Sequence, residues 1–411
     1  EHVARDRRLQ QASALGGEAA GCVQLRGEYL FSAEGKRGLR VLDVASAANK
    51  GFSQKLISAP FSPLGHDTTV KSRDATCVAL PTTQPVYPPR NEGDLMRKAN
   101  LEQPFLPIYN YALVTDAVEG LIVVDVNTLA DGEFRDNFLE RALTWNPEGR
   151  LTGARRLVIA GNLVYIVTPR ALVVVDMTAP MRPTLLAELP LEDPRAVALQ
   201  FRYLFVTTAR GLEVIDVTRP AAPRRVPGAV VPLAGAAGLS VARTYAYVAS
   251  GADGIAIVDV ERPERPTLLT RWNAEGRIAD ARDVMVASTN ASLFAYVADG
   301  KGGLKVVQLT SPASQPNFYG FSPAPRPELI AWHATRAPAL SLSRPLERDR
   351  AVDESGGQVA VFGRRGSRPF NLAEMRRLYL DADGEPWFVD DAPAVTTAAS
   401  AQRQARTEVR R

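Results

Sequence analysis

A short apolar motif that ends in aspartate recurs six times along this chain of 411 residues. The clearest copy is Gly211–Val217, which reads Gly-Leu-Glu-Val-Ile-Asp-Val; the others are Gly38–Val44, Gly120–Val126, Ala171–Met177, Gly254–Val260 and Gly303–Leu309. A glycine followed by an apolar, β-branched run indicates a strand that begins at a turn. Because the strand returns along most of the chain, the sequence predicts a repeat protein whose units bury their faces against one another.

A second run rich in aromatic and β-branched residues precedes each motif, as in Tyr203–Val206 and Tyr245–Val248. Between run and motif lie glycine, aspartate and serine, as in Ser250–Gly254. Two such runs joined by a short turn of residues that tolerate positive φ predict a β-hairpin.

Two further strands complete the unit. After three of the motifs comes a Pro-x-x-Pro segment, for example Pro263 with Pro266. Proline has no backbone donor, so it ends the third strand and permits a fourth only at an outer edge. Apolar runs follow the prolines, as in Thr267–Leu269, and others precede the aromatic runs, as in Asp283–Val286. The predicted unit is therefore four antiparallel strands.

The repeat spacing selects the architecture. The last four motifs lie 40, 43 and 49 residues apart, measured between Asp176, Asp216, Asp259 and Gln308. A four-stranded repeat of this length is typical of a β-propeller blade, whereas solenoid coils, the alternative, are usually shorter. We predict an all-β fold, a single β-propeller of six four-stranded blades, and leave a degenerate seventh blade open.

The spacing also suggests the boundaries. Asp43 and Asp125 lie 82 residues apart, which is too far for one blade. We place the first strand of the second blade at Ala75–Leu80 and treat residues 81–107, with their clustered prolines, as an insertion. The predicted divisions are an N-terminal arm (1–20), the propeller (21–363), a helix and hairpin extension (364–391) and a disordered basic tail (392–411).

The degenerate end of the repeat is harder to assign. Asn317–Gly320 is suited to finish the sixth blade. The β-rich runs Leu329–Trp332, Ala339–Leu342 and Gln358–Phe362 are candidates for strands of a seventh blade. A short helix is predicted at Leu372–Arg377 with Asn371 as its N-cap.

One motif is more specific than the strands. Trp145–Leu151 recurs three blades later as Trp272–Ile278, each on the predicted connection from one blade's outer strand to the next blade's inner strand. That connection shares a face with the hairpin turns, and tryptophan beside polar groups suits a recognition surface. The alternative is that tryptophan packs between blades and Asn-x-Glu-Gly makes a tight turn. The candidate binding residues are Trp145, Asn146, Glu148, Arg150, Trp272, Asn273, Glu275 and Arg277.

The repeated aspartates are interpreted as structural. An aspartate at the end of a strand accepts hydrogen bonds from turn amides, and the residues concerned are Asp43, Asp125, Asp176, Asp216 and Asp259. The hairpin loops also carry acids, at Asp116, Glu119, Asp253 and Asp299. Calcium requires six or more converging oxygens. No loop has dense Asp-x-Asp-x-Asp spacing, so no metal site is assigned.

The two cysteines, Cys22 and Cys77, fall at equivalent positions of adjacent inner strands. Equivalent side chains point to the same side of their own blades, which favours two buried thiols and leaves a disulfide as the alternative. The same alignment brings Val158, Val197, Ser240 and Met285 to this position. Such a channel wall is poor in metal ligands.

Composition excludes several classes. The net charge of +4 is mild, and no aromatic and basic residues interleave as in nucleic-acid binders. No apolar run reaches the roughly 18 residues of a membrane span. The chain lacks Cys-x-x-Cys-His, Gly-x-Ser-x-Gly and a phosphate-binding glycine loop, so we expect no cofactor and assign no catalytic residue. It begins at Glu1, which is consistent with removal of a signal peptide.

With its Tyr-x-Tyr-Val runs, Pro-x-x-Pro segments and the string Ile255–Asp259, the chain resembles the LVIVD-repeat β-propellers over roughly residues 20–320. Gln308 departs from the aspartate that the other five copies keep. The resemblance implies a secreted, periplasmic or cell-surface protein of a family with largely unassigned activity, in which some chains occur with multihaem cytochromes. We therefore expect a non-catalytic scaffold that docks a protein partner. The alternative is a propeller enzyme, such as a metal-dependent hydrolase or lactonase.

Overall fold

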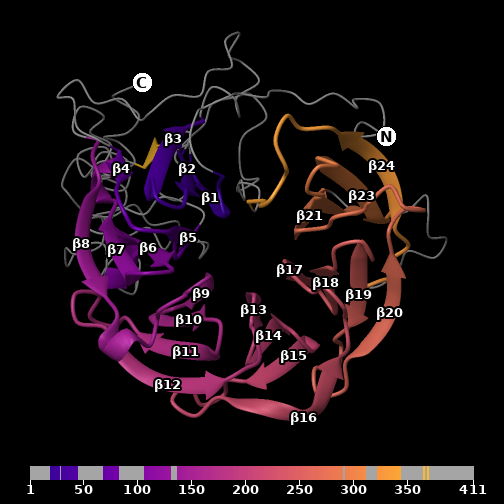
Figure 1. Ribbon diagram of the computed structural model, residues 1–411, viewed down its shortest axis with the longest axis horizontal. Coiled ribbons are helices and arrows are strands. Elements are labelled where there is room, and N and C mark those ends of the chain that lie inside the picture. Colours follow the sequence, from indigo (N-terminus) through magenta and orange to yellow (C-terminus); the bar gives the residue numbers. More distant parts are fainter. Residues whose placement is uncertain are drawn as a thin grey trace, which may run out of the picture. The chain divides into compact units, whose positions relative to one another are not determined.

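A computed structural model describes residues 19–27, 29–44, 68–82, 106–130, 137–289, 292–311, 322–343, 364–365 and 368–369. These residues form six four-stranded antiparallel sheets arranged in a ring (Figure 1), which confirms the predicted β-propeller. We call the sheets blades A to F in chain order. The chain divides into two units, 1–370 and 371–411, and every described residue belongs to the first.

In each blade the first strand lies nearest the centre of the ring and the fourth lies at its rim (Figure 1). The strands of blades A to C are β1 (Cys22–Arg26), β2 (Tyr29–Ala33), β3 (Leu39–Asp43), β4 (Thr69–Val70), β5 (Ala75–Ala79), β6 (Tyr111–Asp116), β7 (Gly120–Asp125), β8 (Glu140–Trp145), β9 (Arg156–Ala160), β10 (Leu163–Val167), β11 (Ala171–Asp176) and β12 (Thr184–Pro190).

The strands of blades D to F are β13 (Ala196–Gln200), β14 (Tyr203–Thr208), β15 (Gly211–Asp216), β16 (Arg224–Val231), β17 (Leu239–Ala242), β18 (Tyr245–Ala249), β19 (Ile255–Asp259), β20 (Thr267–Trp272), β21 (Asp283–Thr289), β22 (Ser292–Ala298), β23 (Leu304–Thr310) and β24 (Glu328–His333). Three single-turn helices, η2 (Pro107–Asn110), η3 (Asn127–Leu129) and η4 (Pro147–Gly149), lie in connections, and β25 (Arg364–Arg365) pairs with β26 (Arg368–Pro369).

The predicted hairpins form as expected. In blade D, β14 pairs with β15 so that Tyr203 lies opposite Asp216. Both faces of this hairpin are covered, because Phe205 packs in a cluster with blade E and Leu204 in a cluster with blade C. Full burial of a side chain of this size contributes about 2 kcal/mol. The motif is therefore apolar at successive positions because neighbouring blades cover both faces of each sheet.

Arginines on the fourth strands tie consecutive blades together at the rim. Arg225 donates to the carbonyl of Pro190 in the preceding blade at 2.8 Å, and Arg271 donates to that of Pro232 at 2.9 Å. Arg141 makes the same contact with Lys71. Each arginine also pairs with an acid of its own blade, namely Glu213, Asp253 and Glu119. The same arrangement thus recurs at three blade junctions.

The end of the repeat differs from the prediction. Leu329–Trp332, a candidate strand of the possible seventh blade, belongs to β24, the fourth strand of blade F. The connection that precedes it is longer than in blades C to E, so the repeat period does not locate this strand. Ala339–Leu342 is described and lies in no sheet. Most of the insertion (83–105), Asn317–Gly320, Gln358–Phe362 and the predicted helix and tail lie outside the described residues.

Replacing Gly211 with alanine is expected to lower the free energy of unfolding by about 3 kcal/mol. Gly211 has a φ of +121°, and an added Cβ would meet the Val231 carbonyl and lie 2.5 Å from the Leu233 nitrogen. Urea denaturation measures the change. Gly251→Ala is the matched control, since its φ is +56° and no atom lies within 4 Å of its Cβ. We expect the control to cost about 1 kcal/mol; equal losses would contradict the steric argument.

Candidate functional site

The two predicted tryptophan turns join blade B to blade C and blade E to blade F. In the first, the side chain of Asn146 accepts a hydrogen bond from the Leu151 amide at 2.8 Å. In the second, the side chain of Asn273 accepts one from the Gly276 amide at 3.1 Å. Both turns contain glutamates with positive φ, 52° at Glu148 and 59° at Glu275. The asparagines therefore fix tight turns, as the structural interpretation required.

The apolar residues of these turns are anchors. Trp145 and the buried Leu151 pack in the cluster between blades B and C, and Trp272 and the buried Ile278 pack in the cluster between E and F. Both turns lie beside a hairpin turn, because the Gly153 amide donates to the Ala117 carbonyl at 2.7 Å and the Asn273 side chain donates to the Ala252 carbonyl.

The charged residues of the same turns face solvent. Glu148 and Arg150 are exposed and pair with each other at 3.2 Å, and Arg150 also pairs with Glu188 at 2.8 Å. Glu275 and Arg277 are exposed as well, and Arg277 donates to the Ala274 carbonyl at 3.0 Å. The structure thus divides the eight candidates into four that hold the turns and four exposed charges on rigid backbones. The binding role of these four stays a prediction.

The strand register defines a layer of residues at the start of the first strands, which we call the axial layer. Each of these residues lies opposite the same position of its blade's second strand; in blade E the contact is a hydrogen bond from the Ala249 amide to the Gly238 carbonyl. The residues are Cys22, Cys77, Arg156, Ala196, Gly238 and Asp283. The predicted alignment was right for the cysteines. It was wrong for Val158, Val197, Ser240 and Met285, which lie one or two residues further along. The sequence alignment matched apolar residues and so chose the wrong register, because the residues that lie in the axial layer of these four blades are charged or very small.

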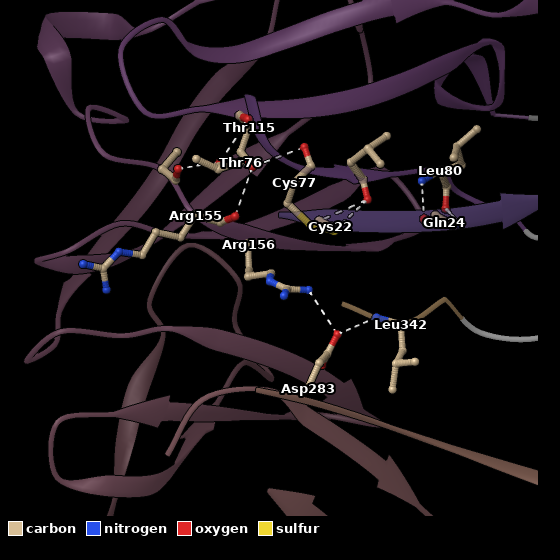
Figure 2. The surroundings of a disulfide bond; sticks show 12 residues. Cys22, Gln24, Thr76, Cys77, Leu80, Thr115, Arg155, Arg156, Asp283 and Leu342 are labelled. Atoms are coloured by element: carbon tan, nitrogen blue, oxygen red, sulfur yellow. Dashed lines mark hydrogen bonds and ion pairs between the residues drawn. A yellow bond between two sulfur atoms is a disulfide. The ribbon is translucent and has the colours of Figure 1, made fainter. Parts of the chain in front are cut away.

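Cys22 and Cys77 form a disulfide between blades A and B (Figure 2). The expectation of two free thiols was wrong. Their Cα atoms lie 4.6 Å apart, within the range that a disulfide spans, because first strands converge near the axis. A register shift in β5 also breaks the strand's alternation, as Ala75 and Cys77 pair with the consecutive residues Asp116 and Thr115. The sequence argument assumed regular alternation.

A charged pair in the axial layer connects blades C and F. Arg156 Nη1 lies 3.8 Å from Asp283 Oδ2, and the Leu342 amide donates to the same oxygen at 3.0 Å (Figure 2). Gly238 makes room, because a Cβ there would lie 2.6 Å from the Cα of Asp283. Asp283 is only 4% exposed. Burial raises the pKa of this carboxyl, and the Arg156 guanidinium opposes that rise.

Carboxylates at the hairpin ends, considered above as calcium ligands, hold the backbone. Asp116 accepts the amides of Val118 and Glu119 through one oxygen and that of Asp74 through the other. Asp299 accepts the amides of Ala279 and Asp280 and lies 3.5 Å from Lys305 Nζ. Within the described residues, no three His, Cys, Asp or Glu side chains gather closely enough to hold a metal ion.

The repeated aspartates cap the connections from third to fourth strands. Asp125, Asp176, Asp216 and Asp259 each accept the backbone amide of the residue two positions later, at 2.7–2.9 Å. The hydroxyl and amide of Thr218 are the main causes that lower the pKa of Asp216 to about 2. Asp43 ends β3, and the turn after it lies outside the described residues.

Sequence reasoning missed a set of charged side chains inside the blades and their partners. The third motif position is charged in three blades and apolar in the others. Arg40 pairs with Glu34 at 2.7 Å, Lys305 pairs with Asp299, and Glu213 accepts from the Thr208 hydroxyl at 2.8 Å. Thr208 ends the second strand of its blade, and Glu34 and Asp299 each lie one residue beyond it. The available signal was the charge at the third motif position, which interrupts an otherwise apolar strand in three blades.

We expect Asp283→Asn to change how stability depends on pH. The pKa of Asp283 is raised in the folded protein. At a pH between the ordinary pKa of 3.8 and this raised pKa, the carboxyl is therefore more often protonated in the folded protein than in the unfolded chain. Stability from this group therefore falls as pH rises through that window. Urea denaturation across pH 4–8 should show the variant gaining stability relative to wild type as pH rises. Asp253→Asn, an exposed control, should follow wild type, and parallel profiles for all three proteins would contradict the assignment.

The fold and these sites were compared with known proteins. A model of the LVIVD repeat family matches residues 153–188, 235–274 and 279–321, which fall in blades C, E and F. The search of curated proteins finds no match. The described residues include no helix with the length and hydrophobicity that crossing a membrane requires.

Solved structures resemble the fold at low sequence identity. A protein from Lactobacillus plantarum is 12% identical with a TM-score of 0.54, over 80% of this chain and 89% of that one. A putative 6-phosphogluconolactonase from Bacteroides fragilis is 14% identical with a TM-score of 0.44, over 62% of this chain and 70% of that one. The first similarity supports the propeller architecture alone.

Proposed function

We propose that this β-propeller, three segments of which match the LVIVD repeat, is a non-catalytic interaction module that docks a protein partner outside the cytoplasm. The observation that carries the proposal is the pair of tryptophan turns. Each presents an exposed glutamate and arginine on a backbone that a partly buried Trp and a buried aliphatic side chain hold in place. Rigid presentation lowers the entropy lost on binding.

The disulfide supports a location in the periplasm, at the cell surface or in the medium. Disulfides persist in oxidising compartments and are rare in the cytosol. Cys22 and Cys77 are both buried, and described residues contain no free cysteine. The partner class that we propose, from the resemblance to LVIVD-repeat proteins, is a multihaem cytochrome or another redox assembly.

Site-specific photo-crosslinking in the native envelope tests the docking proposal. A photoreactive residue placed at Glu148 or Glu275 probes the face of the hairpin turns. The same residue at Arg219 or Arg265, in exposed connections from third to fourth strands, probes the opposite face. We expect one protein to be captured from both Glu positions and to be displaced by unlabelled chain. Capture from the opposite face alone, or no saturable capture, would overturn the proposal.

The second candidate is a hydrolase or lactonase that uses the axial layer. The observation in its favour is Asp283, a buried carboxyl with a raised pKa beside a guanidinium, which can accept and return a proton. Purified protein would be assayed against a panel of lactones and esters with divalent metal added. Turnover that Asp283→Asn abolishes and Asp253→Asn preserves would establish this candidate. Turnover unaffected by either change would exclude Asp283 from the reaction.

A further inference from the structure

Two segments of each blade share the face opposite the tryptophan turns. The inner turn joins the first strand to the second, and the outer connection joins the third strand to the fourth. In blades C to E the first amide of the outer connection donates to the inner turn at 2.7–2.9 Å; the pairs are Met177 with Asn162, Val217 with Arg202 and Val260 with Thr244. We call this surface the proline face; it comprises residues 161–162, 177–183, 201–202, 217–223, 243–244 and 260–266.

Phe201 begins the inner turn of blade D and is 92% exposed. Its φ is +54°, and the equivalent Gly27, Gly161 and Arg243 have φ values of +56° to +60°. This backbone conformation is unfavourable for a bulky side chain, and two-residue turns of this kind favour asparagine and glycine. Neither the backbone nor packing therefore accounts for phenylalanine here. Strain of this kind, with no packing in return, is typical of functional surfaces.

The residues beside Phe201 fix its turn to the next blade. The Gln200 side chain donates to the Arg243 carbonyl of blade E at 2.8 Å. Tyr203 is 7% exposed, and its hydroxyl donates to Glu264 in the outer connection of blade E. The exposed phenyl ring thus projects from a turn that side chains hold on both sides.

The exposed charges of the proline face are mainly positive. Its exposed arginines are Arg182, Arg202, Arg219, Arg262 and Arg265. Its exposed acids are two glutamates, of which Glu264 pairs with Arg202 at 3.3 Å. Met181, 40% exposed, adds a second large apolar side chain to this surface. The face therefore combines exposed apolar groups with an excess of positive charge.

The outer connections hold these arginines at matching positions of successive blades (Figure 1). In each connection the residue before the second proline donates its amide to the carbonyl three residues earlier at 2.7–2.8 Å; the pairs are Arg182 with Ala179, Ala222 with Arg219 and Arg265 with Arg262. Arg219 in blade D is therefore equivalent to Arg262 in blade E, and Arg182 in blade C is equivalent to Arg265. The positive charge is spread across three blades.

We propose that the proline face of blades C to E lies on an anionic phospholipid membrane, with the Phe201 ring inserted among the lipids. An apolar side chain at the bilayer interface leaves water, and arginines beside it attract anionic headgroups. A bilayer presents negative charge over an area wide enough to meet arginines from three blades, whereas an acidic protein would have to match each of them. The proposal is independent of docking at the tryptophan turns, which this orientation leaves directed away from the membrane.

Flotation of the full chain with phospholipid vesicles tests the proposal. We expect wild type to bind vesicles of equal parts phosphatidylglycerol and phosphatidylcholine, to ignore vesicles of phosphatidylcholine alone, and to dissociate at about 1 M salt. Phe201→Gly should lower the partition coefficient for the anionic vesicles about 10-fold, because no ring leaves water. Glycine suits the positive φ, so this variant should unfold at a urea concentration no lower than wild type. Lost stability with unchanged vesicle binding would show a structural role and overturn the proposal.

A second pair of variants tests the arginines. Replacing Arg219 and Arg262 with glutamine should lower the partition coefficient about 30-fold. The matched control replaces Arg170 and Arg210, exposed arginines in hairpin turns on the opposite face, and should bind as wild type does. Equal losses in both double variants, or no preference of wild type for anionic vesicles, would overturn the proposal. Capture of an acidic protein that requires Phe201, without vesicle binding, would assign the face to that protein and overturn it as well.

Discussion

Replacing Cys22 and Cys77 together with serine is expected to lower the free energy of unfolding by about 4 kcal/mol. The disulfide joins residues 55 apart in sequence, so its loss releases a long loop in the unfolded chain. Both sulfur-bearing side chains are buried, at 5% and 3% exposure, so the serines also place hydroxyls in an apolar cluster. Urea denaturation under non-reducing conditions measures the change.

Two comparisons separate the covalent effect from the polarity of serine. Ala196→Ser introduces the hydroxyl at the equivalent buried position of blade D. We expect it to cost no more than about 1 kcal/mol. Wild type unfolded in the presence of dithiothreitol should approach the stability of the double variant. A double variant as stable as Ala196→Ser would contradict a stabilising disulfide.

Replacing Asp116 with alanine is expected to destabilise the protein by about 4 kcal/mol. The side chain is fully buried and accepts three backbone amides, those of Asp74, Val118 and Glu119, at 2.7–2.8 Å. Removing the acceptor leaves three amide donors of partly buried hydrogen bonds without their partner, at about 1–3 kcal/mol for each that water does not reach. Asp116→Asn keeps an oxygen for two of the amides and should lose about half as much. Thermal and urea unfolding provide the measurement.

The effect of Asp116 should depend on pH. Burial acts to raise the pKa of this carboxyl, but the amides of Glu119, Asp74 and Val118 outweigh it and hold the pKa below the ordinary 3.8. The ionised group therefore contributes full stability above pH 3.8, and the contribution is lost as pH falls through the lowered folded pKa. The gap between wild type and Asp116→Ala should narrow in acid. Asp253→Ala, in the equivalent hairpin turn of blade E, should neither destabilise the protein to this extent nor change how its stability depends on pH. An equal loss of stability in Asp253→Ala would contradict the prediction.

Much of the architecture follows from local sequence. Glycine before Leu212 and Ile255 marks the hairpin turns, and the prolines at 263 and 266 mark the edge strand. These signals are short-range, because turn chemistry and alternation act over a few residues. The sequence also predicted that blade B begins with a strand at Ala75–Leu80, ahead of the long insertion, and β5 confirms this strand.

The register of the first strands did not follow from sequence. Their alignment depends on which residue lies opposite the second strand, and a shift of one residue reverses every side chain. Arg156 and Asp283 begin their strands with charges, so an alignment built on apolar residues passed over them in favour of Val158 and Met285. The disulfide was missed for a related reason, since the register shift in β5 has no marker such as glycine at Thr76.

Backbone bridges between a hairpin glycine and the next blade's alanine, as in Gly35 with Ala75 and Gly251 with Ala281, make the ring a row of units that each touch mainly their neighbours. In such a row, cooperative unfolding begins where a unit has fewest neighbours. Blades A and F are the two such units, since between them the described chain provides only residues 339–343. The Cys22–Cys77 bond fastens blade A to blade B. Reduction should therefore convert a single unfolding transition into two, with blade A opening first.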